Sequence, residues 1–135
     1  METQERLITK VLAQTGLAKY QTIVTSGIHH IIVDEPEKNG GADTGMDPQA
    51  LLLASLASCT TITLHMYIDR KQWPIHDIYV SAELFTSGLM KSIRCIISYQ
   101  GELSVEQEFR LLQIANACPI HNILSKSMAI ETVLK

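Results

Sequence analysis

The chain has 135 residues, a formal net charge of −3 and an isoelectric point near 5.9. Hydrophobic residues make up 46% of it and charged residues 19%, which is the composition of a soluble globular protein with one core. No basic cluster supplies the positive face that nucleic acids require, so we expect no nucleic-acid partner. We predict a single domain over residues 1–135.

The N-terminus and the cysteine count indicate the compartment. The opening segment, METQERLITK, lacks the apolar stretch of a signal peptide. Three cysteines are an odd number and too few for a secreted disulfide framework. The predicted location is therefore the reducing cytoplasm, where paired cysteines more often serve catalysis or metal binding than structure.

The first part of the chain predicts a small sheet. Residues 7–14, 17–26 and 28–33 are apolar or alternating runs separated by glycine-containing turns, so we expect a meander of three strands. Residues 34–46, DEPEKNGGADTGM, form the longest predicted loop. Loops of this length in small domains are often functional or mobile.

A long helix is predicted from Pro48 to about Lys71, with Asp47 as its N-cap. Its first half, ALLLASLASC, is apolar or small on every side, which predicts a helix buried all round. The apolar run breaks at Ser55, and several threonines and His65 follow, so we expect no membrane span.

The second half of the chain predicts a hairpin, two helices and a last strand. Residues 76–85 and 89–100 alternate apolar and polar side chains on either side of a Ser-Gly turn. A Ser-Val-Glu-Gln capping box begins a helix over residues 104–115. A short helix is expected over 120–126, and residues 128–133 are predicted to form the last strand. Grouped strands and helices favour an α+β fold over a parallel, doubly wound one.

The three cysteines allow different interpretations. Cys59, near the middle of the long helix, can be an ordinary buried core residue, and Cys95 alternates with apolar residues in a predicted core strand. Cys118 directly precedes Pro119 and a predicted helix start, where backbone N–H groups and the helix dipole favour a thiolate.

Two other chemistries would use the same side chains. Cys118 and His121 are three residues apart and can form a cysteine–histidine dyad, although no third orienting residue or oxyanion motif is visible. Cys59, Cys118 and His121 with one further histidine would make a zinc set, but the spacing matches no zinc finger or ribbon, so we expect no metal. No phosphate loop or dinucleotide fingerprint occurs, and no cofactor is expected.

Two cysteine-containing segments resemble the OsmC/Ohr family. Residues 47–60 (DPQALLLASLASCT) and 66–74 (MYIDRKQWP) are similar to the central helix of that family. Residues 114–121 (IANACPIH) are similar to its second cysteine motif. The segment 27–41, with GIH, DEP and GG, resembles the OsmC-like branch, and the likeness runs from about residue 7 to the end of the chain.

The resemblance implies an OsmC-like α+β fold in which antiparallel sheets wrap around long central helices of an intertwined homodimer. It also implies a cofactor-free thiol peroxidase acting on organic hydroperoxides or peroxide. Cys59 would attack the O–O bond and become a sulfenic acid, and Cys118 would resolve it as a disulfide. A dithiol reductant would then restore the two thiols.

The chain departs from the peroxidase members of the family in two places. Those members carry a glutamate nine or ten residues before the first cysteine, where this chain has Ala50 and Gln49, and their catalytic arginine has no counterpart in its motif. We therefore expect Gln49 and His121 to support the cysteine pair. The departures favour an alternative, a non-catalytic dimer of the same fold that binds a small apolar or electrophilic ligand.

Overall fold

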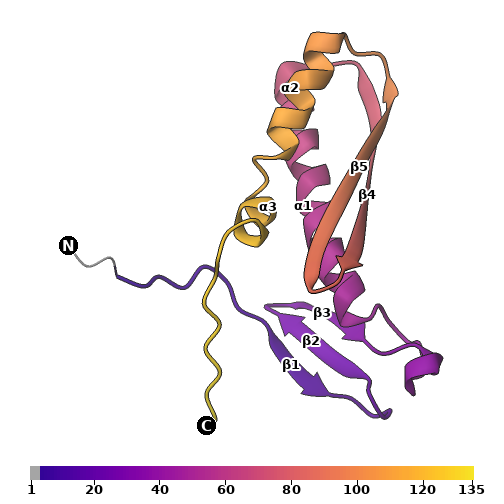
Figure 1. Ribbon diagram of the computed structural model, residues 1–135, viewed down its shortest axis with the longest axis vertical. Coiled ribbons are helices and arrows are strands. Elements are labelled where there is room, and N and C mark those ends of the chain that lie inside the picture. Colours follow the sequence, from indigo (N-terminus) through magenta and orange to yellow (C-terminus); the bar gives the residue numbers. More distant parts are fainter. Residues whose placement is uncertain (1–3) are drawn as a thin grey trace. The chain divides into compact units, whose positions relative to one another are not determined.

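The computed structural model describes residues 4–135 (Figure 1). The chain divides into two compact units, one up to Leu51 and the other Leu52–Lys135. The helices and strands, in chain order, are β1 (Leu12–Thr15), β2 (Thr22–Ser26), β3 (His29–Val33), the 3₁₀ helix η1 (Glu37–Asn39), α1 (Pro48–Lys71), β4 (Ile75–Ser87), β5 (Met90–Gly101), α2 (Val105–Ala115) and α3 (Pro119–Leu124). Helices and antiparallel sheets confirm the predicted α+β class.

The first unit contains the predicted meander. Strands β1, β2 and β3 are antiparallel neighbours in that order, with Val24 of β2 opposite Ala13 and Ile31. The strands are shorter than predicted, and residues 4–11 lie outside the sheet. Apolar runs alone do not set strand ends, because a strand ends where its neighbour ends.

Asp34 organises the loop that follows β3. Its side chain is buried, and its carboxylate accepts hydrogen bonds from the N–H of Glu35 (2.8 Å) and from the N–H (3.1 Å) and hydroxyl (2.5 Å) of Thr44. The hydrogen bond from the Thr44 hydroxyl is the main reason why the pKa of Asp34 lies below its usual value. Val33 and Met46 form a parallel bridge beside these contacts. The two ends of the loop are therefore tied together.

Helix α1 begins as predicted. Pro48 is its first residue, and Asp47 accepts a hydrogen bond from the N–H of Ala50 at 2.8 Å. By length and composition α1 would pass as a membrane span, with a mean hydropathy of 1.5 over an 18-residue window, but core helices of soluble proteins pass the same test. One side of this helix does pack into a protein core.

The prediction that α1 is buried all round is wrong. Leu56 and Leu64 are buried, whereas Leu52, Ile62 and Met66 are 42%, 54% and 68% exposed. A run that is apolar on every side shows that no face requires water, but it does not show which neighbour covers each face.

The core of the second unit is formed by α1, α2 and the hairpin of β4 and β5, which Figure 1 shows alongside α1. Leu64 and Ile68 of α1 meet Leu111 and Ala115 of α2 in this core. Partly buried residues of the hairpin and connecting segments complete it: Trp73, Ile75, Ile78, Ile97, Tyr99, Leu103 and Ile114. The packing holds the C-terminal half of α1 against α2.

The end of the chain differs from expectation in one element. The capping box at Ser104 and Gln107 is confirmed, and Pro119 begins α3. The strand predicted over residues 128–133 is absent from the part of the chain that the structure describes, and Ile130 and Val133 in it are exposed. Alternating apolar residues form a strand only where a neighbouring edge can take their backbone hydrogen bonds.

We predict that Asp34→Asn destabilises the protein at neutral pH and that this effect shrinks as the pH falls below about 4. The pKa of the folded carboxyl is lowered, so its stabilisation is present above the pKa of the unfolded chain and is lost as the pH falls through the folded value. Urea unfolding followed by circular dichroism over a pH series measures the difference.

The matched control is Asp43→Asn in the same loop, because Asp43 is exposed and its positive φ of 55° suits asparagine. We expect little change from this variant at any pH. An Asp34→Asn effect of constant size across the series would show that the carboxylate charge contributes nothing.

Candidate active site

The structure brings Cys59 and Cys118 together. Cys59 lies in the middle of α1 and is half-buried, and Cys118 is the N-cap residue of α3 and is fully buried. Each thiol shifts the pKa of the other, so the two sulfurs lie close together. Two of the three cysteines, far apart in sequence, therefore form one chemical unit.

The end of α2 explains why Cys118 points at α1. Ala115 is buried against α1, and the N–H of Cys118 bonds to the Ala115 carbonyl at 3.3 Å, which turns the chain directly after the helix. Cys118 itself has φ −58° and ψ 134°, outside the helical region. The first N–H groups of α3 have no carbonyl partner inside the helix, so those of Ile120 and His121 are free to bond to the sulfur.

Four neighbouring groups lower the pKa of Cys118. Burial by itself raises the pKa of its thiol. The thiol of Cys59, the N–H of His121, the hydroxyl of Thr60 and the N–H of Ile120 all donate to the sulfur and lower the pKa. The hydrogen bonds outweigh burial, and the pKa of Cys118 lies below its usual value.

Cys59 is shifted the other way. Burial and the hydrogen bond with Cys118 raise its pKa, and the N–H of Ile120 and the hydroxyl of Thr63 oppose this only in part. The two shifts have opposite directions because each thiol is one cause of the other's shift. Of the two thiols, Cys118 therefore has the lowered pKa and Cys59 the raised one.

The two supporting residues expected from the sequence are placed differently. His121 serves Cys118 through its backbone N–H, and its buried Nδ1 has no hydrogen-bond partner among residues 4–135. Gln49 is exposed and precedes Cys59 by ten residues of α1, which is about 15 Å of helix. Within one chain, α1 itself keeps Gln49 away from Cys59.

The prediction that Cys95 belongs to the core is wrong. Cys95 is exposed, although it alternates with the partly buried Ile93 and Ile97 on β5. Desolvation and the charge of Cys118 raise the pKa of its thiol. The alternation identified the face of the strand correctly, but α1 and α2 do not cover that face along its whole length.

Sequence reasoning missed Thr60 and Thr63. Thr63 follows Cys59 by four residues, a spacing that places two side chains on one helix face, so this contact had a visible signal. Thr60 had none, because its partner Cys118 comes from a different helix.

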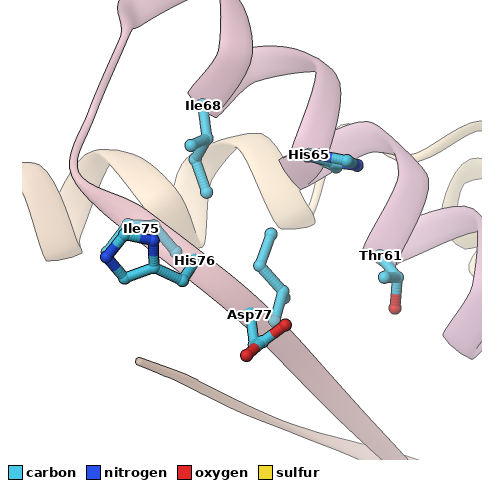
Figure 2. A pocket seen from close by; sticks show the side chains of 7 residues that line it. Thr61, His65, Ile68, Ile75, His76 and Asp77 are labelled. Carbon is cyan, nitrogen blue, oxygen red and sulfur yellow. The ribbon is translucent and has the colours of Figure 1, made fainter. Parts of the chain in front are cut away.

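A separate cleft of about 190 Å³ lies on another side of α1 (Figure 2). Residues of α1 and of the start of β4 line it: Thr61, His65, Ile68, Ile75, His76, Asp77 and Ile78. Thr61 follows Cys59 by two residues, which turns its side chain about 200° around the helix. Within residues 4–135, no group of three or more His, Cys, Asp or Glu side chains is placed to hold a metal ion.

Comparison with known proteins now identifies the family. The family model described as OsmC-like protein matches residues 40–133, which include both cysteines of the pair. The chain belongs to the OsmC-like family. No curated protein matches this OsmC-like chain.

Solved structures share the OsmC-like fold. An OsmC-like protein from Mycoplasma pneumoniae is similar with a TM-score of 0.66 and 18% identity, covering 90% of this chain and 89% of that one. An organic hydroperoxide resistance protein OsmC from Legionella pneumophila gives 0.61 and 18%, covering 90% and 91%. The organic hydroperoxide resistance protein OhrB of Bacillus subtilis gives 0.58 and 22%, covering 87% and 90%. At these identities the likeness shows the fold.

We predict that the low-pKa thiol of the OsmC-like chain is Cys118. In reduced Cys95→Ser protein, thiolate absorbance in the ultraviolet should show a first transition below the usual thiol pKa of about 8.5. Cys118→Ser should abolish that transition, whereas Cys59→Ser should keep it, because the serine hydroxyl can still donate to Cys118. The reverse pattern would place the thiolate on Cys59.

Proposed function

We propose that the chain is a cofactor-free thiol peroxidase that reduces organic hydroperoxides or hydrogen peroxide through Cys59 and Cys118. The observation that carries the proposal is the proximity of two thiols, of which one, Cys118, has a lowered pKa. Membership of the OsmC-like family and the fold shared with two organic hydroperoxide resistance proteins support a peroxide-related role.

The contacts suggest how the reaction begins. Cys59 is the partly accessible member of the pair, so it meets the peroxide first. Its proton passes to Cys118 along their hydrogen bond, and the resulting Cys59 thiolate attacks the peroxide. An S–O bond forms and the O–O bond breaks. The departing alkoxide takes the proton from Cys118 and leaves as an alcohol.

The second step forms the disulfide. Cys59 now carries a sulfenic acid, and the Cys118 thiolate attacks its sulfur. The S–S bond forms as hydroxide leaves and is protonated by solvent. Two thiols have then been oxidised to one disulfide, and the peroxide has been reduced to an alcohol and water. An external dithiol regenerates both thiols by two thiol–disulfide exchanges, which suits a cytoplasmic protein.

A homodimer is the second part of the proposal. Leu52, Ile62 and Met66 lie on the same face of α1 as Cys59, and all three are exposed. An exposed apolar helix face of this kind is usually buried against another surface. We propose that the same face of a second copy of the chain packs against it. Such packing places Cys59 beside the dimer interface. The partner's Gln49 can then approach Cys59, which the Gln49 of the same chain cannot do.

A specific observation keeps the alternative open. The cleft beside His65 and His76 is a small, mixed polar and apolar space that the cysteine chemistry does not use. A dimeric protein that binds a small ligand without turnover would account for it. Persistence of all thiols after peroxide treatment favours this second function.

We predict that one equivalent of an organic hydroperoxide removes two of the three thiols of the reduced protein. Peptide mapping should find the disulfide between Cys59 and Cys118, because these are the two sulfurs in contact. A parallel sample with hydrogen peroxide tests which class of peroxide is preferred.

Three single variants separate the roles in this assay. Cys59→Ala should remove hydroperoxide consumption, and Cys118→Ala should stop at a sulfenic acid that a dimedone-type reagent traps. Cys95→Ala is the matched control and should keep full consumption, since Cys95 is outside the pair. Full consumption by Cys59→Ala would overturn the peroxidase proposal.

We predict that Met66→Lys converts the dimer into a monomer in sedimentation velocity. A charge on the exposed apolar face must be desolvated for two copies to pack there. His65→Lys, at the adjacent exposed position near Asp69, should leave the dimer intact. An unchanged mass for Met66→Lys would exclude this face as the interface.

A further inference from the structure

Three positive side chains surround Tyr67 near the end of α1, where this helix lies beside α2 (Figure 1). Their charged groups lie 5.6, 5.8 and 5.7 Å from the centroid of the tyrosine ring, in the order Arg70, Lys71 and Arg110. All three side chains are exposed, whereas Tyr67 is only 5% exposed. In a chain whose net charge is −3, this is a local concentration of positive charge.

Within the described part of the chain, no carboxylate forms an ion pair with any of these three cations. The nearest acid in sequence on α1 is Asp69, which faces His65 at 3.6 Å. On α2, Glu106 precedes Arg110 by one turn and forms no ion pair with it. The positive charge is therefore not balanced by the protein's own acids.

Arg110 is held in place by two hydrogen bonds. Its Nε donates to the hydroxyl oxygen of Tyr67 at 3.2 Å, and one terminal nitrogen donates to Oε1 of Gln113 at 3.1 Å. The dipole of α1 favours Arg70 and Lys71 in its last turn, but it does not account for Arg110, which belongs to α2. A guanidinium has five N–H donors, and these two bonds use only two of them.

The hydroxyl of Tyr67 is a further donor. Its oxygen accepts the hydrogen bond from Arg110, and no acceptor within residues 4–135 takes its proton. A tyrosine this deeply buried usually has a partner for its O–H group, because burying an unpaired polar group costs free energy. The surroundings of the ring thus offer N–H and O–H donors together with positive charge. This combination is typical of a site for an anionic oxygen group.

We propose that Tyr67, Arg70, Lys71 and Arg110 bind a phosphate group. A phosphate monoester carries a charge of about −1.5 to −2 at neutral pH and has three acceptor oxygens, so it can face several cations and accept the tyrosine proton at once. A carboxylate has a single charge and two oxygens and matches these donors less fully. Tyr67 follows Cys59 by eight residues of α1, about 12 Å, and the site uses neither cysteine of the pair. The inference is therefore independent of the proposed peroxidase function.

Trp73 makes binding observable. It is the single tryptophan of the chain, and its ring meets that of Tyr67 edge to face, with centroids 5.2 Å apart. Titration of the full-length protein with inorganic phosphate, at an ionic strength kept constant with chloride, should change the fluorescence of Trp73 in a saturable way. Acetate under the same conditions should bind at least tenfold more weakly. No saturable response to phosphate, or an equal response to both anions, would overturn the proposal.

Variants of Arg110 and Tyr67 test the two fixed donors. Arg110→Gln removes one charge and should weaken phosphate binding about tenfold, whereas Arg110→Lys keeps the charge and should lose less. Tyr67→Phe keeps the ring beside Trp73 but removes the hydroxyl, and should also weaken binding about tenfold. Far-ultraviolet circular dichroism checks that each variant is folded. If Arg110→Gln does not fold, Lys71→Gln at the exposed end of α1 provides the same test of charge.

Arg94→Gln is the matched control. Arg94 also lies over an aromatic ring, 4.7 Å from the centroid of Phe85, and its substitution changes the net charge by the same amount. Phosphate binding should stay at the parent value in this variant. An equal loss in Arg94→Gln and Arg110→Gln would show an effect of net charge alone and would overturn the proposal. Unchanged binding in both Arg110→Gln and Tyr67→Phe would overturn it as well.

Discussion

The proximity of Cys59 and Cys118 is the constraint on which the proposed chemistry of this protein depends. It exists because α2 is anchored to α1 through Leu111 and Ala115, and because the chain turns directly after Ala115. Without that packing, Cys118 would not be held beside Cys59. Core packing and reactivity are therefore coupled at the end of α2.

The groups that lower the pKa of Cys118 are electrically neutral. The resemblance to peroxidases implied a glutamate and an arginine near the first cysteine, but the structure supplies hydroxyl and backbone N–H donors instead. Fixed dipoles stabilise a buried charge with a smaller desolvation penalty than a buried cation would bring. These donors lower the pKa of the buried Cys118, whereas the pKa of the partly exposed Cys59 is raised.

Two departures from the sequence-based picture have the same physical cause. The exposed face of α1 around Met66 and the unpaired residues 128–133 both have apolar patterns. Such patterns predict that the side chains are buried. A pattern states that a side chain avoids water, but not which surface receives it. A second copy of the chain would provide such a surface for α1, and this is why the proposed dimer and the position of Cys59 belong together.

The sequence by itself determined the features that depend on near neighbours. The Asp47 cap of α1, the Ser104 capping box and the hairpin of β4 and β5 were predicted because each signal lies within a few residues. Family membership also followed from the sequence, because both cysteine motifs are continuous segments. The pairing of the two cysteines came only from the resemblance.

Only the tertiary structure decided which groups meet across elements. It showed that Cys118 lies close to Cys59, that Cys95 is exposed, and that the second cysteine is the one with the lowered pKa. These features depend on how α3 packs against α1 and on how far along β5 the helices cover its side chains. Such contacts join residues far apart in sequence, and no local pattern of residue types encodes the distance between them.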